Sequence, residues 1–298
     1  MAPGGYRWLY ADAISADGRF SLVLITLLGS VFSPYYAWAG RRAPLDHCAL
    51  NVCLYGPGVR RWAMTERRAG EVEAGEDHVR LGPSAVRFED GALIYDIAEY
   101  GAPVPLRVRG QVVIRPEAEQ SETFTLDAAG RHVWRPIWPR ARVEARFTAP
   151  DLRFSGEAYV DMNAGEEPLE AGFRSWNWAR TALPDGAAIL YDSVWKDGGG
   201  QGLALRIGPD GKAAAFDPPP LKDLPLTGWR VARAARSEGS AQVQQTLEDT
   251  PFYARSLIST ELLGAPRKSM HESLDLTRFS SPVVKMMLPF RMPRAFWR

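Results

Sequence analysis

The sequence contains few of the residues from which metal and redox sites are built. Its 298 residues include two cysteines and four histidines, and no cluster has the spacing of a metal site. Cys48 and Cys53 lie five residues apart in an apolar segment typical of a strand. An odd spacing places them on opposite faces of that strand, which disfavours a disulfide bond. We expect two reduced, inert thiols, with a metal site that includes His47 as the weaker alternative.

Motifs of several enzyme classes are also missing. The chain has no glycine-rich phosphate loop and no nucleophile elbow. Its net charge of +1, with 24% charged residues, gives no electrostatic reason to expect a nucleic-acid partner. We therefore expect a protein that binds no nucleic acid and works without a cofactor or a metal.

No apolar run is long enough for a membrane-spanning helix. The longest, Phe20–Phe32, has thirteen residues, whereas a spanning helix needs roughly 20. We expect a buried strand that leads into a turn, with an element that grips a membrane surface as the alternative. The run follows a mixed polar start, which is not typical of a secretory signal, so we expect a cytoplasmic protein.

Short β-type segments between turn signals dominate the sequence. Asp-Gly pairs at Asp90 and Asp210 are typical of hairpin turns. This pattern favours an all-β protein of sandwiches or barrels over a βαβ sheet. The expected strands are Leu22–Leu28, Ala49–Tyr55, Arg61–Glu66, Val79–Leu81, Ala85–Glu89, Ala92–Ala98, Leu106–Ile114, Thr123–Leu126, Arg142–Thr148, Leu152–Val160, Phe173–Ala179, Ala187–Tyr191, Gly202–Ile207 and Ala213–Phe216.

The length allows one large domain or two of ordinary size. Arg135–Arg140 contains two prolines, and we expect it to be extended and to cross between two halves. We place one β domain at residues 1–140 and a second at residues 141–298. Ser256–Leu263 fits a short helix and a strand equally well.

Acidic, imidazole and aromatic side chains are concentrated between Gly130 and Trp178. A proton donor, groups that could tune it and many aromatic faces thus lie close together in sequence. This combination suggests acid–base chemistry, without a cofactor, on a large apolar substrate. The residues are His132, Trp134, Trp138, Tyr159, Asp161, Asn163, Glu166, Glu167, Glu170, Trp176 and Trp178.

Asp161 is the strongest candidate for the acid. We expect it at the end of a strand, before the turn-forming residues 162–165. Tyr159 faces the same side of that strand, and Trp134 shares a face with His132, so the two pairs could oppose each other across one cavity. His132 could then hydrogen-bond Asp161 or a water molecule. The competing interpretation of each residue is structural, as a turn residue or as part of a core.

Other residues are weaker candidates for the site. Tyr35, Tyr36 and Trp38 could line an entrance or pack in a core, and Trp176 and Trp178 could line a substrate path or fill a core. Asp192, beside Tyr191, is a second candidate for the acid. The loop carboxylates Glu166, Glu167 and Glu170 fit a solvated surface or ion pairs with Arg174 and Arg180. The candidates for substrate contact are Tyr35, Tyr36, Trp38, Trp138, Trp176, Trp178 and Tyr191.

Several segments together resemble the carotenoid 1,2-hydratases, also called hydroxyneurosporene synthases. The resemblance covers most of the chain from Phe20 to Arg294, whereas the first nineteen residues carry little of it. Its segments are GSVFSPYYAWAGR (Gly29–Arg41), NVCLYG (Asn51–Gly56), RWAMTER (Arg61–Arg67), LGPSAV (Leu81–Val86), GRHVWRPIWPRARVE (Gly130–Glu144), YVDMNAGEEPLEAGFRSWNWAR (Tyr159–Arg180) and HESLDLTRFSSPVVKMMLPFRMPR (His271–Arg294).

The resemblance implies two lipocalin-like β-barrel or sandwich halves, with an aromatic-lined cavity between or within them. It also implies that the partners are an acyclic carotenoid, such as neurosporene or lycopene, and water, with no redox cofactor or metal. Water would add across the terminal C1=C2 bond. The resemblance assigns the chemistry to the HVW and YVD segments, and hence to His132, Trp134, Tyr159 and Asp161.

This chemistry fits the residue types. Hydration of such an alkene begins with protonation at the less substituted carbon, and water then captures the tertiary carbocation. A carboxylic acid removed from water can stay protonated near neutral pH. Trp and Tyr faces attract a nearby cation by about 0.5–2 kcal/mol.

The segment from Arg278 to Arg298 carries basic residues interleaved with apolar ones and no acidic residue. This pattern suits a segment at an anionic membrane surface, and we expect peripheral contact with the inner, photosynthetic membrane. The alternative is a core strand with a frayed basic end. The residues are Arg278, Lys285, Arg291, Arg294 and Arg298, with Val283, Val284, Met286, Met287, Leu288, Phe290, Met292, Phe296 and Trp297 between them.

Three rival functions remain open. The first is a lipocalin-like carrier, which would need an aromatic cavity but no acid. The second is a glycosidase that uses two carboxylates such as Asp161 and Glu170. The third is a pericyclase-like enzyme on a related scaffold, which would shape a polyene without adding water.

Overall fold

The computed structural model describes residues 1–294. The chain forms two compact units. The first unit comprises Met1–Phe124, Arg131–Pro168 and Met286–Arg298, and the second comprises Thr125–Gly130 and Leu169–Lys285.

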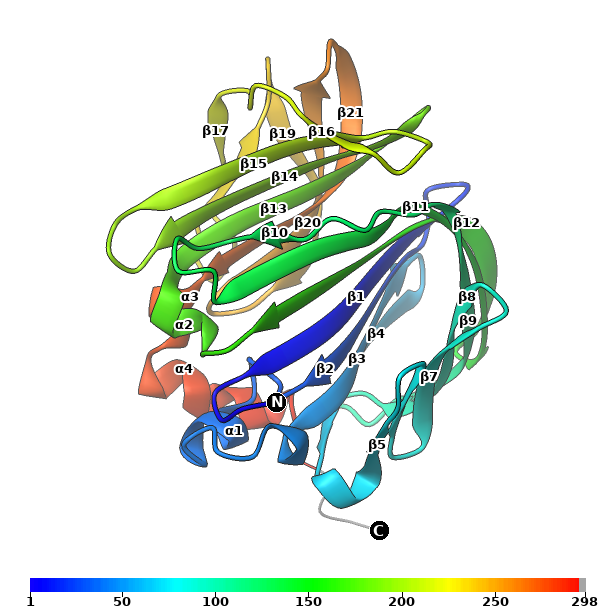
Figure 1. Ribbon diagram of the computed structural model, residues 1–298. Coiled ribbons are helices and arrows are strands. Elements are labelled where there is room, and N and C mark those ends of the chain that lie inside the picture. Colours follow the sequence, from blue (N-terminus) through cyan, green and yellow to red (C-terminus); the bar gives the residue numbers. More distant parts are fainter. Residues whose placement is uncertain (295–298) are drawn as a thin grey trace. The chain divides into compact units, whose positions relative to one another are not determined.

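A large antiparallel sheet builds the first unit (Figure 1). Its strands are β1 (Tyr6–Ser15), β2 (Ser21–Leu28), β3 (Cys48–Gly56), β4 (Val59–Arg67), β5 (Val72–Ala74), β6 (His78–Leu81), β7 (Ser84–Glu89), β8 (Ala92–Tyr100), β9 (Arg107–Ala118), β10 (Phe124–Thr125), β11 (His132–Ala149) and β12 (Asp151–Gly165). Their spatial order is β4-β3-β2-β1-β12-β11-β9-β8-β7-β6-β5, with β10 beside β11. The first strand therefore pairs with β12, far away in sequence.

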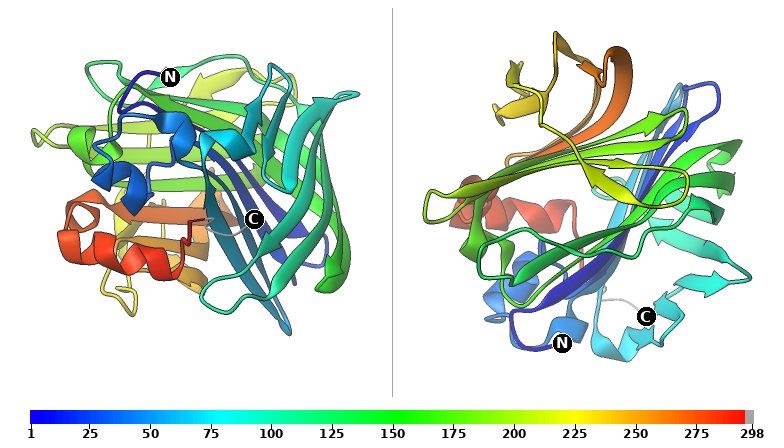
Figure 2. Two further views of the ribbon diagram at one scale, coloured as in Figure 1. Left: turned by 90° about the horizontal axis from the view of Figure 1, so that it is seen from below. Right: turned by 45° about the horizontal axis from the view of Figure 1, so that its top comes forward.

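This sheet curves into a nearly closed barrel, and Figure 2 shows the curvature from two further directions. Buried polar contacts link the edge strand β4 to β8, which lies near the other end of the strand order. Arg67 Nη2 on β4 donates to Glu99 Oε2 on β8 at 3.0 Å, and Ser84 Oγ on β7 donates to Glu99 Oε1 at 2.8 Å. Burial raises the pKa of the Glu99 carboxyl, although the Arg67 charge opposes this shift.

The two faces of the barrel sheet carry different side chains. Ala11 on β1 and Val160 on β12 belong to one apolar core cluster, together with Trp138 on β11. Side chains alternate along a strand, so Tyr10 and Asp12 on β1 lie on the opposite face. That opposite face is also buried in this region. The barrel core and the polar, aromatic face are therefore separate environments.

A second antiparallel sheet builds the second unit. Its strands are β13 (Phe173–Leu183), β14 (Gly186–Trp195), β15 (Gly200–Ile207), β16 (Ala213–Ala215), β19 (Ala241–Asp249), β20 (Tyr253–Leu262) and β21 (Ala265–Asp275), in the order β16-β15-β14-β13-β21-β20-β19. The hairpin of β17 (Leu221–Leu224) and β18 (Arg233–Arg236) packs on one face of this sheet. His271 Nε2 lies 2.9 Å from Ala234 O, and Ala234 N donates to Asn177 Oδ1 at 3.3 Å.

Helices are short. They are α1 (Pro34–Trp38), α2 (Leu169–Gly172), α3 (Leu276–Phe279), α4 (Pro282–Met287) and the 3₁₀ helices η1 (Pro44–Asp46), η2 (Ala69–Glu71) and η3 (Leu288–Phe290). Across residues 1–294, none of them has the length and apolarity needed to traverse a bilayer.

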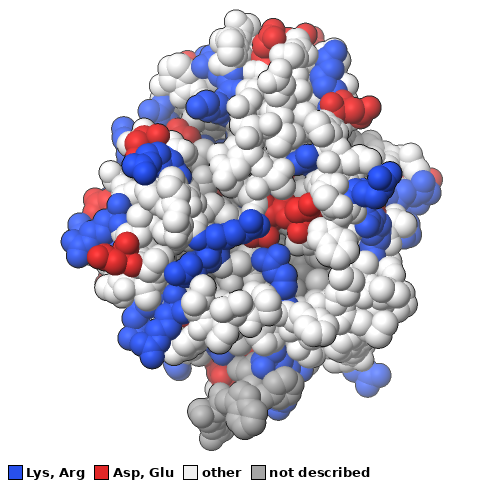
Figure 3. All heavy atoms as spheres, turned by 180° about the vertical axis from the view of Figure 1, so that it is seen from behind, with Lys and Arg blue, Asp and Glu red and all other residues white. Residues whose placement is uncertain are grey.

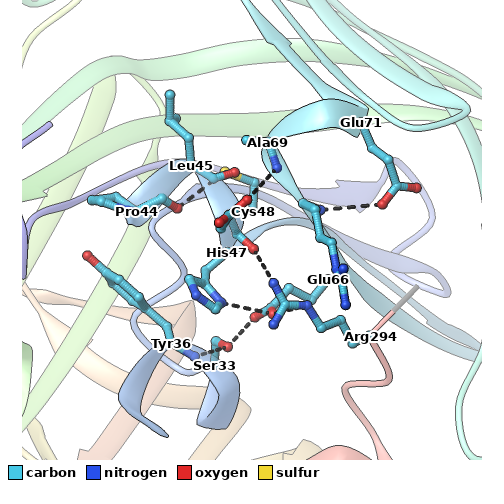
Figure 4. Close-up of polar contacts among 12 residues, drawn as sticks. Ser33, Tyr36, Pro44, Leu45, His47, Cys48, Glu66, Ala69, Glu71 and Arg294 are labelled. Carbon is cyan, nitrogen blue, oxygen red and sulfur yellow. Dashed lines mark hydrogen bonds and ion pairs between the residues drawn. The ribbon is translucent and has the colours of Figure 1, made fainter. Parts of the chain in front are cut away.

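The C-terminal segment is fastened to the first unit at a buried carboxylate (Figure 4). Glu66 accepts a hydrogen bond from Ser33 Oγ, and its Oε1 lies 3.0 Å from His47 Nδ1 and 3.4 Å from Arg294 Nε. Arg294 Nη2 also donates to Asp46 O at 2.9 Å. Residues 295–298, which include the predicted tail residues Phe296, Trp297 and Arg298, lie outside the described part of the chain.

Each strand expected from the sequence overlaps an observed one, and Ser256–Leu263 lies in strand β20 up to Leu262, where that strand ends. Arg135–Arg140 is extended as expected, but the prediction that it crosses between halves was wrong, because it lies inside β11. The pairing register shifts between Arg135 and Trp138 and again between Trp138 and Ala141. Such irregularities accommodate prolines that a regular ladder would exclude.

The division of the chain also differs from the expected boundary at residue 140. That position lies within β11, which pairs with β12 over most of its length. The two strands form one long hairpin and stay in the first unit, so the chain, apart from Thr125–Gly130, passes to the second unit after Pro168.

Candidate active site

Asp161 is held by two hydrogen-bond donors on the polar, aromatic face of the barrel sheet. Trp134 Nε1 and the Tyr159 hydroxyl each donate to Asp161 Oδ2 at 2.8 Å. Trp134 comes from the neighbouring strand β11, and Tyr159 precedes Asp161 by two residues on β12. The Asp161 residue is 4% exposed, and both aromatic side chains are fully buried. The carboxyl group therefore has a fixed orientation and little contact with water.

The prediction that Asp161 ends a strand was wrong. Strand β12 continues to Gly165, and residues 162–165 pair with both β1 and β11 instead of forming a turn. Turn-forming residue types stay extended here because a strand on each side satisfies their backbone hydrogen bonds. The central position makes the Asp161 backbone more rigid than a loop position would.

Strand β1 adds a row of side chains to the same face. Tyr10 pairs with Asp161 and Asp12 pairs with Tyr159 in the antiparallel register, and directly opposed residues share a face. The ring centroids of Tyr10 and Tyr159 are 6.3 Å apart. Asp12 is 1% exposed. Two buried carboxyl groups therefore lie close to one phenol.

His132 lies farther along this face, opposite Gly165. Its Nδ1 forms a 2.9 Å hydrogen bond with the Tyr6 hydroxyl, and its Nε2 is 3.5 Å from Glu167 Oε1. A Cβ on Gly165 would lie 2.4 Å from the Tyr6 ring and 2.7 Å from His132 Nδ1, so glycine is required for this contact. Gly165 is four residues from Asp161, roughly 13 Å along the strand. At this distance from Asp161, the imidazole lies beside Tyr6 and Glu167.

The two predicted pairs lie side by side. Trp134 and His132 do share one face of β11, and Tyr159 and Asp161 share the same face of β12. They do not oppose each other across a cavity, because β11 and β12 are adjacent strands of one sheet. The result is a continuous surface of aromatic and ionisable groups.

Burial and the neighbouring carboxyl groups keep Tyr159 protonated. Burial is the largest cause that raises the pKa of Tyr159 well above its ordinary value of 10.0, and the nearby Asp161 and Asp12 carboxylates raise it further. Its hydroxyl therefore remains a donor over the physiological pH range. With Oδ2 of Asp161 accepting two hydrogen bonds, Oδ1 is the oxygen suited to carry a proton when the group is neutral.

The other aromatic candidates of the first unit lie elsewhere. Trp138 belongs to the barrel core, on the face opposite Asp161. Tyr36 is fully buried, and its hydroxyl donates to Gly5 O at 3.1 Å, which indicates a structural role. Tyr35 and Trp38 have ring centroids 5.7 Å apart, and Trp38 is 55% exposed.

The remaining candidates belong to the second unit. Trp176, Trp178 and Tyr191 are buried there, with Trp178 opposite Tyr191 and ring centroids of Trp176 and Tyr191 5.9 Å apart. Asp192 forms a bidentate ion pair with Arg236, with contacts of 2.6 to 3.1 Å to both carboxylate oxygens. This pairing makes Asp192 a structural carboxylate and a poor candidate for the acid.

Two of the loop carboxylates form ion pairs, with partners other than the expected Arg174 and Arg180. Glu167 Oε2 lies 2.6 Å from Arg131 Nη1, and Glu170 Oε1 lies 3.2 Å from Lys285 Nζ. Glu167 is thus shared between Arg131 and His132. The partly exposed Glu167 carboxylate therefore lies between the buried imidazole and the exposed Arg131 side chain.

Four residues of this face were missing from the predicted site, because all come from the unpredicted strand β1. The first nineteen residues carry little of the family resemblance, so nothing directed attention to them. The sequence feature that could have identified them is an alternation of aromatic or acidic residues with other residue types along residues 6–12. The four are Tyr6, Trp8, Tyr10 and Asp12.

Neither a metal site nor a disulfide is formed by the described residues. Over residues 1–294, no three His, Cys, Asp or Glu side chains are grouped as metal ligands. Cys48 and Cys53 are buried, unbridged thiols. As expected from their spacing, Cys48 joins the barrel core, whereas Cys53 Sγ donates to Asn51 Oδ1 at 3.3 Å. Burial raises the pKa of the Cys48 thiol to about 11, which makes it unreactive.

Comparison with known proteins identifies the family. The model of the carotenoid hydratase CrtC family matches residues 24–298. The chain belongs to this family. Strand β1, with Tyr10 and Asp12, precedes the matched region.

Named relatives of this carotenoid hydratase family cover nearly the whole chain. The chain is 51% identical to an acyclic carotenoid 1,2-hydratase of Thiocapsa roseopersicina, over 99% of the chain and 74% of the relative. It is 45% identical to an acyclic carotenoid 1,2-hydratase of Rubrivivax gelatinosus, with the same coverage. A putative AttH from Nitrosomonas europaea has a similar fold, with a TM-score of 0.61 and 14% identity over 91% of this chain and 92% of that one. This likeness concerns the fold alone and agrees with the expected lipocalin-like, all-β architecture.

Proposed function

We propose that this chain hydrates the terminal C1=C2 double bond of an acyclic carotenoid, such as neurosporene or lycopene, to a tertiary alcohol. The observation that carries the proposal is the buried Asp161 carboxyl, oriented by Trp134 and Tyr159, in a member of the carotenoid hydratase family. Relatives at 51% and 45% identity are named acyclic carotenoid 1,2-hydratases.

Asp161 is the proposed acid. In its neutral form, Oδ1 transfers a proton to C2 of the alkene, and the electron pair of the double bond forms the new C–H bond. The carboxylate that results is stabilised at once by the Trp134 and Tyr159 donors on Oδ2. Donors that are already oriented cost no reorganisation as charge develops, and this is usually a large part of catalysis.

Aromatic side chains are proposed to stabilise the carbocation at C1. Tyr10 and Tyr159 lie beside the acid, and Tyr6 and Trp8 continue the aromatic row, with ring centroids 5.0 Å apart. A cation near such ring faces gains about 0.5–2 kcal/mol for each good contact. Water then forms the C1–O bond and loses a proton, so the net reaction adds one water molecule and requires no redox cofactor or metal.

His132 is proposed to position the water-accessible end of the site. Its Nδ1 is hydrogen-bonded to Tyr6 and its Nε2 lies 3.5 Å from Glu167 Oε1, and Glu167 is 24% exposed at its side chain. Imidazole and carboxylate together form a route by which protons can exchange with solvent. His132 is thus a positioning residue in this proposal, and Asp161 is the catalytic one.

We also propose peripheral contact with a membrane, because the substrate is insoluble in water. Arg291 lies 4.2 Å from the Trp62 ring centroid and Arg294 binds Glu66, so these two tail cations make contacts within the protein. By contrast, Met286 is 59% exposed and Phe290 is 73% exposed. Apolar side chains of the α4–η3 segment are therefore better candidates than these two arginines for insertion into a bilayer surface.

Charge gives this docking proposal little support of its own, because Arg291 and Arg294 make contacts within the protein. On the face drawn in Figure 3, basic and acidic side chains are interspersed with broad uncharged areas. Burial of the exposed apolar side chains would supply most of the binding free energy, at about 25 cal/mol per Å² of apolar surface.

The proposed reaction is tested with lycopene in liposomes and water labelled with ¹⁸O. The expected product is a tertiary alcohol that carries ¹⁸O and is heavier than lycopene by one labelled water molecule. Oxygen derived from dioxygen would exclude hydration. A protein that binds the polyene reversibly, in a folded and liposome-bound state, and never converts it would be the carrier instead.

A further inference from the structure

The buried face around Asp161 contains a second carboxyl group. Asp12 on β1 is 1% exposed and pairs directly with Tyr159 on β12. Tyr10, two residues earlier on the same face, pairs with Asp161. Asp12 and Asp161 are therefore diagonal neighbours on adjacent strands, with α carbons roughly 7–8 Å apart.

Tyr159 stands between the two carboxyl groups. Its hydroxyl donates to Asp161 Oδ2 at 2.8 Å, and Asp12 is near enough for its negative charge to help raise the pKa of Tyr159. Two carboxyl groups this close in a site that excludes water resist simultaneous ionisation. One proton shared by the pair is the arrangement with the lower electrostatic cost.

We propose that Asp12 is the second carboxyl group of the catalytic site and takes up the proton that water loses when it captures the carbocation. This inference rests on the proposed function. Hydration needs a proton donor for C2 and then a proton acceptor for the water that attacks C1. A neutral Asp161 and an ionised Asp12 supply one of each.

The proton balance then closes within the site. Asp161 gives one proton to C2, water forms the C1–O bond, and the proton released by that oxygen binds Asp12. The next cycle requires the proton on Asp161 again. Transfer of the proton from Asp12 back to Oδ1 of Asp161 returns it, so the carboxyl pair is unchanged overall.

This role predicts uncoupling in Asp12→Asn. Protonation by Asp161 continues, but the captured water has no acceptor, so the carbocation loses a proton and reverts to alkene. In D₂O, hydration should fall about 10²-fold or more. Recovered lycopene should meanwhile gain deuterium, and the ratio of exchange to hydration should rise at least tenfold. Asp12→Glu, which retains a carboxyl, should restore part of the hydration.

Glu99→Gln is the matched control, because Glu99 is a buried carboxyl of the same sheet that lies away from this face. It should lower stability without raising the exchange ratio. If Asp12→Asn does not fold, Asp12→Ser provides the same test with a smaller side chain. Wild-type hydration by a folded Asp12 variant would overturn the inference and leave the proposed function intact. Loss of both hydration and exchange in a folded variant would also overturn it. A wild-type protein that adds no water would instead refute the proposed function.

Discussion

The indole nitrogen of Trp134 lies 2.8 Å from Oδ2 of Asp161, across the boundary between β11 and β12. The acid is therefore oriented by the neighbouring strand as well as by Tyr159 on its own strand. Each donor stabilises the carboxylate that forms on proton transfer. A hydrogen bond to a charged group contributes about 1.5–3 kcal/mol.

Removal of either donor should therefore slow the chemical step. We expect Trp134→Phe and Tyr159→Phe each to lower kcat roughly 10- to 150-fold, with a small change in KM because the aromatic ring remains. Steady-state kinetics on liposome-embedded lycopene give both values. Trp195→Phe is the control, because Trp195 Nε1 donates to Leu126 O in the second unit. An unchanged kcat in both site variants would show that these hydrogen bonds serve the fold alone.

The second unit should lose stability in mild acid because of His271. Burial lowers the pKa of His271 to about 4 from an ordinary value of 6.5. Between pH 7 and pH 5 the unfolded chain therefore binds a proton that the folded chain does not. The free energy of unfolding therefore falls as the pH falls, and this residue contributes about 2 kcal/mol to that loss.

Urea unfolding at pH 7 and pH 5 measures this contribution. His271→Gln should show a smaller fall in unfolding free energy than the wild type over that interval. His78→Gln is the control with the opposite sign, because a hydrogen bond to Asp77 raises the pKa of the exposed His78. Equal pH dependence in the wild type and in His271→Gln would contradict the expected role of the buried imidazole.

Membrane docking should depend on the exposed apolar residues Met286 and Phe290. We expect the double change Met286→Ser and Phe290→Ser to reduce flotation with anionic liposomes and activity on liposome-embedded lycopene. Activity on detergent-solubilised lycopene should persist. Val104→Ser, at a residue that is 60% exposed elsewhere in the first unit, controls for the loss of one exposed apolar side chain. Undiminished flotation of the double variant would exclude this segment as the docking element.

Point substitutions are preferable to truncation of the tail. Deleting residues 289–298 would also remove Arg294 from the buried Glu66 carboxylate. Ser33 and His47 would remain on this carboxylate, but the loss of its arginine partner should still destabilise the fold. A docking defect in the truncated chain could then arise from unfolding.

The sequence predicted which side chains share the face of one strand better than it predicted how the strands pair. Period-two alternation correctly placed Tyr159 with Asp161 and His132 with Trp134, because local alternation is a property of a single strand. The adjacency of β11 and β12 depends on strand pairing, which local pattern does not encode. The turn-forming residues after Asp161 were misleading because flanking strands overrode their local preference.

The contribution of β1 could not be inferred from family resemblance. Tyr10 and Asp12 lie only a few residues from the N-terminus, yet they pair with Asp161 and Tyr159 more than 140 residues later. Their alternation was visible in the sequence, but their partner was not. Contacts between residues this distant along the chain appear only in the folded structure.

Deuterium transfer by Asp161→Asn tests the central claim most directly. In D₂O the wild-type protein should place one deuterium on the carbon next to the carbinol. The Asn side chain keeps the shape but has no acidic proton, so both hydration and exchange into lycopene should fall about 10²–10⁴-fold. Thermal unfolding and lycopene binding should stay close to wild type. Hydration by Asp161→Asn at the wild-type rate, with the same deuterium content, would contradict the account.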